Sequence, residues 1–161
     1  MVYNIELLKA DIADELEKIE MIVNEYRTIE PKIDLPPGEV SYYDRGAIGY
    51  LLHNFYNGCE NMFRSIAMFF ENDLGPRTWH KDLLKRMRIE VKGYRPKVID
   101  NELFLLLDDF RALRHKVRHT YAFELDWERE QLVAKKMIHT KNILEKQILH
   151  FIKQLDAGLG E

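Results

Sequence analysis

The sequence predicts an all-α protein, a four-helix up-and-down bundle with an additional short helix. Apolar residues recur with helical spacing along nearly the whole chain, and the alternating pattern of β-strands is absent. Turn signals divide the chain into two long helices, one short helix and two further helices. The 161 residues, 46% of them hydrophobic, suit a single domain spanning residues 1–161 with one core.

The first two helices are long and are separated by a turn-rich link. Ile5, Ile12, Ile19 and Tyr26 recur every seven residues, and Pro31 ends this first helix. The segment "DLPPGEV" has the composition of a turn. "SYYD", with a serine and an aspartate three residues apart, resembles a capping box, so we expect a second helix that begins there and ends before "GP" at 75–76.

Three more helices follow in the second half of the chain. The third is expected from about Thr78 to Val91, where "KGYRP" interrupts it. Asp100 can cap a fourth, "NELFLLLDDFRALRHKVRHTY", and Asp126 can cap a fifth. The buried stripe of this fifth helix is expected to contain Val133, Met137, Leu144, Ile148 and Leu155.

The composition excludes several classes of protein. A net charge of −3 and a pI near 6.1 exclude a chain that coats nucleic acid through its gross charge, although a local basic patch remains compatible. Cys59 is the only cysteine, so an intrachain disulfide is impossible and a small packed residue in a reducing, cytoplasmic protein is expected. No apolar run approaches the ~18 residues of a membrane span, and we expect no signal peptide.

Charge is unevenly distributed along the chain. Residues 6–30 carry eight acids against three bases, whereas residues 77–97 carry eight bases against two acids. This predicts one acidic and one basic flank. The basic flank is interpreted either as a solvated face or as a surface that contacts phosphates.

The end of the fourth helix, "RALRHKVRHTY" (111–121), concentrates positive charge. A helical projection places Leu106, Phe110, Leu113 and Val117 in a narrow core stripe. The remaining surface forms a basic arc of about 140°, made of Arg114, Arg118, Arg111, His115 and His119. Like charges four residues apart destabilise a helix by a few tenths of a kcal/mol, so the arc is expected to face an anion. Neutralisation by acids from another helix is the alternative.

Two chemistries could use this arc. His115 and His119 have the spacing of a zinc pair, but the neighbouring arginines repel a dication and no third ligand is evident, so no metal is expected. In phosphodiester cleavage, Arg114 would hold the phosphate and His119 would transfer protons. RNA supplies its own 2′-hydroxyl nucleophile, so no cofactor is required. The two residues lie about 140° apart on one helix, which favours a cleft built by two copies, a homodimer.

The segment "RHKVRHTY" matches R-x4-H-x-Y with Arg114, His119 and Tyr121, and it resembles the HEPN superfamily, specifically its HepT-like toxins. "LLHNFYNGCENMF", "TWHKDLLKRM" and "GYRPKVI" extend the resemblance over most of the chain. It implies a metal-independent, dimeric endoribonuclease whose catalytic pair here is Arg114 and His119. His115 departs from the family pattern, since many members have asparagine or another small polar residue there.

The resemblance also implies a partner. HepT-like toxins of the type VII (HEPN/MNT) toxin–antitoxin systems are neutralised by an MntA-like nucleotidyltransferase that transfers AMP to the motif tyrosine, here Tyr121. This chain lacks the G-S-x-x-x-R pattern of such a transferase, so the antitoxin is expected to be a separate protein.

Supporting residues are expected around the motif. Arg111 and Arg118 would steer the backbone of the RNA substrate, a tRNA or an mRNA. In the second helix, Asn57 shares a face with two further asparagines, and Glu60 lies nearby. These side chains either brace the bundle or orient the catalytic pair. Two alternative functions remain at this point: a non-catalytic partner that presents substrate to a nucleotidyltransferase, and an RNA-binding protein that does not cleave.

Overall fold

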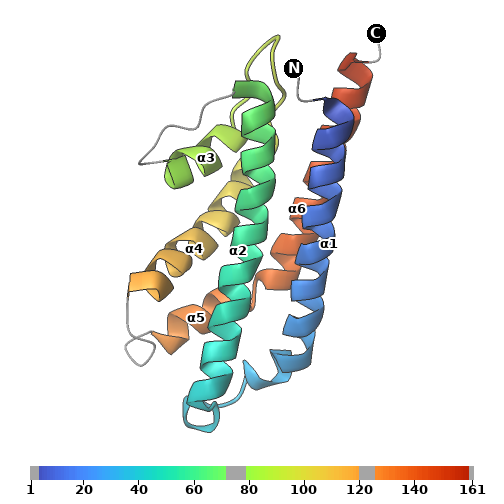
Figure 1. The fold of residues 1–161 in the computed structure, drawn as a ribbon. Helices are drawn as coiled ribbons and strands as arrows, with labels where there is room; N and C mark the ends of the chain where they lie inside the picture. The colour runs from blue at the N-terminus through green and yellow to red at the C-terminus, as the bar shows by residue number, and fades with distance from the viewer. Residues whose placement is uncertain (1–3, 72–78, 120–125, 160–161) are drawn as a thin grey trace.

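Four long helices form an up-and-down bundle in this computed structural model (Figure 1). The structure describes residues 4–71, 79–119 and 126–159, with the side chains of 79–81, 115–119 and 159 excepted. The long helices are α1 (Ile5–Ile29), α2 (Tyr42–Glu71), α4 (Asn101–His119) and α6 (Met137–Leu159). Two short helices, α3 (Trp79–Met87) and α5 (Trp127–Ala134), precede and follow α4, and the link from α1 to α2 contains the 3-10 turns η1 (Glu30–Lys32) and η2 (Pro37–Glu39). The predicted all-helical bundle is confirmed.

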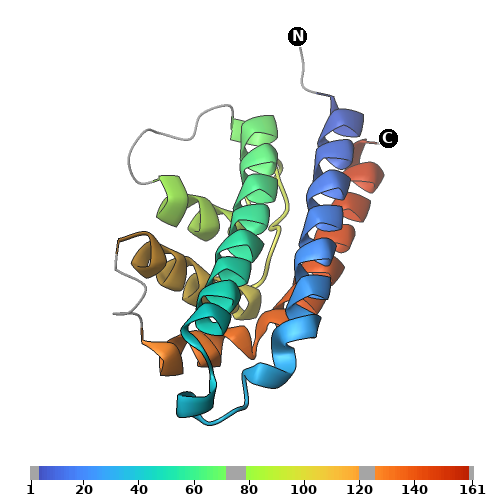
Figure 2. The same cartoon turned by 60° about the horizontal axis from the view of Figure 1, so that its bottom comes forward.

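Helices α1 and α6 run antiparallel along one side of the bundle, while α4 crosses the other side of α2 (Figures 1 and 2). An ion pair of 3.2 Å between Lys9 Nζ and Asp156 Oδ1 links the first turns of α1 to the last turns of α6. The described ends of the chain therefore lie together at one end of the bundle.

Polar side chains cap the helices where the sequence predicted it. The Asp44 amide donates to Ser41 Oγ at 3.0 Å, and the Leu103 amide donates to Asp100 Oδ1 at 2.8 Å. Asp126 caps α5 by accepting from two amides of its first turn. Asn4 caps α1 in the same way, at a position where no cap was predicted. Each cap satisfies amides that the first turn of a helix leaves without partners.

The core lies between the four long helices. The aromatic rings of Phe55 in α2 and Phe110 in α4 pack with their centroids 5.0 Å apart. The stripe predicted for the last segment is buried in full: Val133, Met137, Leu144, Ile148 and Leu155. Cys59 is buried as well, and burial raises the pKa of its thiol, so it packs as a small unreactive side chain.

The prediction of one continuous fifth helix is wrong. Lys135 and Lys136 interrupt it, separating α5 from α6 and giving the bundle a second short helix. The Tyr26 hydroxyl donates to the carbonyl of Ala134 at 2.7 Å, which satisfies an acceptor at the break. The two lysines bind acids on different elements, Asp34 and Asp109, at 3.2 Å each. Tertiary contacts thus stabilise a break in a segment that contains no proline or glycine.

The third helix is shorter than predicted. It ends at Met87, and a tight turn with paired backbone groups of Val91 and Arg95 follows. Gly93 occupies the turn at φ 75°, a left-handed conformation that favours glycine. The second helix is described to Glu71, and its predicted end near Gly75 lies outside the described residues.

The buried stripe observed on α4 is wider than the predicted stripe and is shifted around the helix. Phe110 and Leu113 are buried as predicted, but Leu106 is only half-buried and the Val117 side chain lies outside the described residues. Among the other described side chains of α4, Leu103, Phe104 and Leu107 are buried as well. Because α4 packs against both α2 and α6, it buries a wider arc than a single contact would require.

Candidate functional site

Arg114 and Glu60 form an ion pair between α4 and α2. The Nη1 atom of Arg114 lies 3.6 Å from Oε2 of Glu60, and the two side chains are 14% and 6% exposed. The Nε–H of Arg114 is buried and has no hydrogen-bond acceptor among the described residues. A charge taken this far out of water requires an opposite charge close by. Glu60 supplies it, so the guanidinium is anchored on its α2 side.

Tyr56 extends this polar contact one turn along α2. Its side chain is buried, and burial raises the pKa of its hydroxyl well above the usual range. Glu60 raises this pKa further, whereas Arg111 and Arg114 act in the opposite direction. Tyr56 is thus an electrostatic neighbour of both arginines and of Glu60. Sequence reasoning missed it, although its position four residues before Glu60 predicts a shared helix face.

Arg111 has an acid of its own helix as partner. Its Nε donates to Asp108 Oδ1 at 2.7 Å, a contact three residues apart along α4. The two described arginines of the basic arc, Arg111 and Arg114, are therefore each neutralised from a different direction. This arrangement agrees in part with the alternative interpretation of the sequence, in which acidic residues neutralise the basic arc.

The other predicted site residues from this part of the chain, His115, Arg118, His119 and Tyr121, lie in the last turns of α4 or beyond its described end. Helix α4 continues without a break to His119, so Arg114 and His119 are separated by about 140° around one helix. The backbone of His115, Arg118 and His119 belongs to this helix, but their side chains lie outside the described residues. Tyr121 lies outside them altogether.

The basic run at 77–97 is partly used inside the fold. Arg86 Nη1 lies 2.8 Å from Glu71 Oε2, and Arg95, whose side chain is buried, lies 3.6 Å from Glu71 Oε1. Arg88 stacks over the Phe104 ring at 4.1 Å from its centroid. These three arginines stabilise the contacts of α3 and the following loop with α2 and α4.

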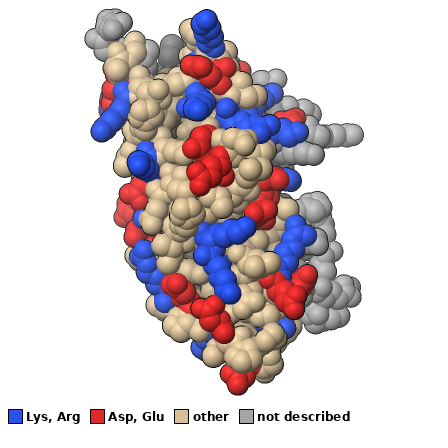
Figure 3. Space-filling view, turned by 180° about the vertical axis from the view of Figure 1, so that it is seen from behind, with Lys and Arg blue, Asp and Glu red and all other residues tan. Residues whose placement is uncertain are grey.

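Acidic and basic side chains also alternate on the back of the molecule (Figure 3). Ion pairs also join the helices to one another: Lys141 pairs with Glu20 of α1 and with Glu145 of its own helix. The two separate flanks expected from the sequence are therefore only partly present on the folded surface. The interpretation of a basic surface that contacts phosphates therefore depends more on the end of α4 than on residues 77–97.

The exposed side of α2 is almost uncharged. Asn57 belongs to it and is half-buried, one turn before Glu60. We define the α2 outer face as Tyr43, Gly46, Ala47, Tyr50, Asn54, Asn57, Asn61, Arg64 and Met68, all exposed or half-buried. These positions fall within about 100° of one another on the helix. Asparagine and tyrosine dominate it, and Arg64 is the one charged residue of this set.

A second buried acid lies where α5 contacts α2. Glu130 is 2% exposed, and burial raises the pKa of its carboxyl to about 7 although Arg45 opposes the shift. A Cβ atom at Gly49 would lie 2.6 Å from Glu130 Oε1, so the missing side chain admits the carboxyl. The Arg45 guanidinium also lies over the Trp127 ring, 5.4 Å from its centroid. These contacts hold α5 against α2. In the sequence, α5 directly follows the segment that carries the motif.

A comparison with known protein families matches the part of the chain that contains most of α2 and all of α4 and α5. A family model described as HepT-like protein matches residues 47–155, from the first turns of α2 to the last turns of α6. The chain belongs to the HepT-like protein family. The helical bundle is the HEPN-like fold that this HepT-like membership implies. No curated protein and no solved structure matches the chain significantly.

The resemblance read from the motif is thus confirmed at the level of the family. The match includes Glu60 and Arg114, which the HepT-like fold brings together from α2 and α4. In the part of the chain that the structure describes, no helix is both long and apolar enough to cross a membrane.

Proposed function

We propose that this HepT-like protein is the toxin of a HEPN/MNT toxin–antitoxin pair and a metal-independent endoribonuclease. The observation that carries the proposal is the Arg114–Glu60 ion pair at the head of the R-x4-H-x-Y motif. The ion pair fixes one side of the Arg114 guanidinium. After Arg114, the same helix carries four further cationic or titratable residues, His115, Lys116, Arg118 and His119. HepT-like family membership supports the same reaction class.

Arg114 would bind the scissile phosphate. Its contact with Glu60, at 3.6 Å, is longer than a hydrogen bond, so the carboxylate orients the guanidinium without engaging its full donor set. A guanidinium has five N–H donors, and a phosphate approaching the 14% of the side chain that is exposed can accept from those on the outer edge. Arg114 would then stabilise the charge that develops on the phosphate oxygens.

His119 would transfer the protons. A histidine near its usual pKa can accept the proton of the ribose 2′-hydroxyl as that oxygen bonds to phosphorus. The bond from phosphorus to the 5′-oxygen breaks, and the leaving oxygen receives a proton. The products are a 2′,3′-cyclic phosphate and a 5′-hydroxyl. Arg111, Arg118 and His115 would position the RNA backbone around this centre.

A homodimer would bring Arg114 and His119 to one phosphate, and the α2 outer face is the surface that we assign to it. Interfaces are depleted of Lys, Glu and Asp and enriched in Tyr, Met and Arg, and this face has that composition. A two-fold axis places a face against its own copy. The acidic surface of α1 is a poorer candidate for the interface, because its like charges would repel one another across the axis. RNA is a poorer occupant, since one arginine neutralises few phosphates.

Tyr121 would receive AMP from a separate nucleotidyltransferase antitoxin. The tyrosine follows His119 by two residues, so a bulky anion on it competes with the scissile phosphate for the cationic end of α4. Modification would therefore silence the toxin by occupying its own substrate site.

The proposal is tested by incubating the purified protein with RNA in EDTA and analysing the ends of the products. Cleavage that leaves 2′,3′-cyclic phosphates and is lost on His119→Ala is the expected result. Activity that requires added metal, or that persists in His119→Ala, contradicts it.

One observation favours a second function. Arg114 is largely covered by its contact with α2, as a purely structural ion pair would be. In that case the chain would be a non-catalytic subunit that presents substrate to the nucleotidyltransferase. Growth arrest when this chain is expressed alone separates the two functions, because only the toxin causes it.

A further inference from the structure

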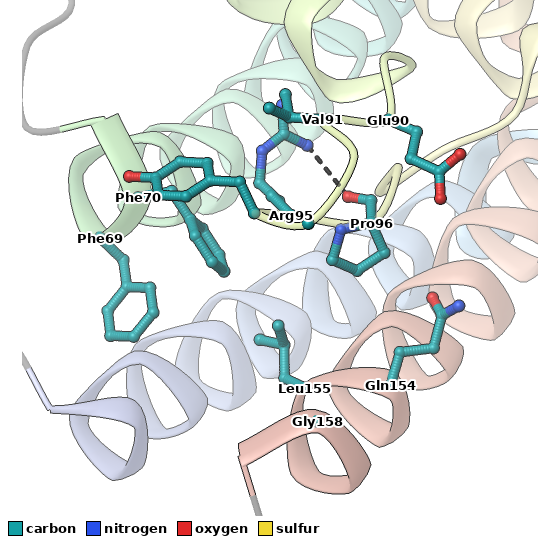
Figure 4. A pocket seen from close by; sticks show the side chains of 11 residues that line it. Phe69, Phe70, Glu90, Val91, Arg95, Pro96, Gln154, Leu155 and Gly158 are labelled. Atoms are coloured by element: carbon teal, nitrogen blue, oxygen red, sulfur yellow. Dashed lines mark hydrogen bonds between the residues drawn. The ribbon is translucent and has the colours of Figure 1, made fainter.

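A cavity of about 500 Å³ opens at the end of the bundle where α2 and α6 finish (Figure 4). Its walls come from three separate parts of the chain: the last turn of α2, the loop after α3, and the last turns of α6. This volume is in the range of pockets that bind small organic ligands, ~300–1,000 Å³. Arg114, the residue of the R-x4-H-x-Y motif whose side chain the structure describes, is not among the residues that line it.

One wall of the cavity is aromatic. The Phe69 and Phe70 rings meet edge to face with centroids 4.8 Å apart, and Tyr94 lies 5.9 Å from Phe70. Phe70 also packs on Phe151 of α6, which holds the group against the core. Tyr94 is 57% exposed, so the aromatic wall retains a free surface on which a flat ring can stack.

The loop that carries Tyr94 is rigidly braced. Val91 and Arg95 exchange two backbone hydrogen bonds of 2.8 Å across the Gly93 turn. The buried Arg95 side chain donates from Nη1 to the Pro96 carbonyl and from Nη2 to the Arg86 carbonyl. The cavity is therefore formed before any ligand arrives, which lowers the entropic cost of binding.

The opposite wall is polar. Glu90 and Gln154 lie on the side across from Phe69 and Phe70, one from the loop and one from α6 (Figure 4). A carboxylate offers two acceptor oxygens, and a carboxamide offers two N–H donors and an acceptor. Leu155 and Gly158 form the floor between the two walls.

We propose that this cavity binds a guanine base. A flat heterocycle would stack on the aromatic wall and present its hydrogen-bonding edge to Glu90 and Gln154. Guanine has two adjacent N–H groups, which match the two oxygens of a carboxylate, and beside them a carbonyl oxygen, which matches a carboxamide N–H. Adenine, cytosine and uracil each lack the second adjacent N–H group.

The base can come from a free guanine nucleotide or from a guanosine in single-stranded RNA. The chemistry that recognises it is the same in both cases. The binding does not depend on the ribonuclease proposal, because none of the described residues that line the cavity belongs to the motif.

Calorimetric titration with GMP, AMP, CMP and UMP tests the proposal on the full-length chain. We expect GMP to bind at least tenfold more tightly than the other three. Glu90→Gln should weaken GMP binding at least tenfold. Gly158→Leu should abolish it, because a Cβ at 158 meets nothing within 4 Å and the side chain can fill the floor without displacing the helix. Glu102→Gln, on the exposed first turn of α4, is the matched control and should bind normally.

A second arm uses a 2′-O-methyl oligonucleotide with one guanosine, which lacks the nucleophile for self-cleavage and binds whether or not the protein is a nuclease. Binding of this strand that depends on Glu90, without binding of GMP, assigns the base to RNA and supports the proposal. Equal affinity for all four nucleotides, or binding in both arms that ignores Glu90→Gln and Gly158→Leu, overturns it, as does the absence of binding in both arms. Circular dichroism verifies that each variant is folded.

Discussion

Arg114 of α4 and Glu60 of α2 lie with Nη1 and Oε2 3.6 Å apart, and both side chains are largely shielded from water. Glu60 is a buried acid, and a buried charge is tolerated where an opposite charge offsets its loss of hydration. The pair therefore couples the position of α4 to α2 at the first residue of the motif. It also explains why an acid is found among the mostly apolar buried residues of α2.

Glu60→Gln should reduce RNA cleavage in EDTA by roughly 10- to 100-fold, mainly in kcat, because Arg114 loses its orientation rather than its charge. A double-mutant cycle separates positioning from general stability. In an Arg114→Ala background, Glu60→Gln should cause no further loss of activity.

Asp108→Asn is the matched control for Glu60→Gln, since it removes the acid that pairs with Arg111 on the same helix. It should leave kcat within about threefold of wild type. Equal losses for the two acid variants, or an undiminished effect of Glu60→Gln when Arg114 is absent, would contradict a positioning role.

Glu130 should make the stability of the protein depend on pH. Its pKa is about 7 in the folded chain against an ordinary value of 4.5, so between these values the folded chain holds a proton that the unfolded chain has released. The free energy of unfolding therefore falls as pH rises through this window and the contribution is constant above it. Glu130→Gln, neutral at every pH, should escape this loss.

Urea unfolding of wild type and Glu130→Gln at pH 5 and pH 8 measures the effect. The difference in unfolding free energy between the two proteins should shift by on the order of 2 kcal/mol in favour of the variant at pH 8. An identical pH dependence in both proteins would show that the Glu130 carboxyl titrates normally.

Two glycines of α2 should respond oppositely to alanine. A Cβ at Gly58 would lie 2.8 Å from Cγ1 of the buried Ile19, so Gly58→Ala should destabilise the α1–α2 contact by about 1–3 kcal/mol. Gly46 has open space within one chain, and in the monomeric Tyr50→Glu background Gly46→Ala should stabilise the helix by about 0.5–1 kcal/mol. Thermal unfolding distinguishes these signs. Stabilisation by both substitutions would mean that α1 and α2 are not in close contact at Gly58.

The α2 outer face should control the oligomeric state. Tyr50 is 66% exposed on it, and Tyr50→Glu would bury two like charges across a two-fold interface. Sedimentation velocity should show a dimer for wild type and a monomer for the variant. Tyr94→Glu, at a similarly exposed tyrosine away from this face, should remain dimeric. A monomeric wild type, or dissociation of both variants alike, would refute the assignment.

Local signals predicted the parts of the fold that depend on neighbouring residues. The caps at Ser41, Asp100 and Asp126 lie where expected because each bond is made within one turn. The break at Lys135–Lys136 escaped prediction, since contacts with Tyr26, Asp34 and Asp109 stabilise it from across the chain. No pattern within the segment itself records such contacts.

The same division applies to the candidate site. Helical spacing placed Arg114 in a basic arc that was expected to face an anion. Glu60 was one of several residues of the second helix that were expected to orient it. Which of them makes the contact depends on the crossing of α2 and α4, a property of packing that one-dimensional periodicity does not contain. The cavity beside Phe70 and Glu90 was invisible for the same reason, because three distant segments build it.

The most direct test of the account compares Arg114→Ala with Arg111→Ala in metal-free RNA cleavage. The two arginines lie three residues apart on α4, and each pairs with one acid, so loss of charge is matched. Arg114→Ala should lower the rate in EDTA at least 100-fold, whereas Arg111→Ala, which loses only a contact with the RNA backbone, should lower it by less than about tenfold, mainly through KM. Equal rates for the two variants, or wild-type protein that cuts no RNA without metal, would contradict the assignment of Arg114 as the residue that holds the phosphate.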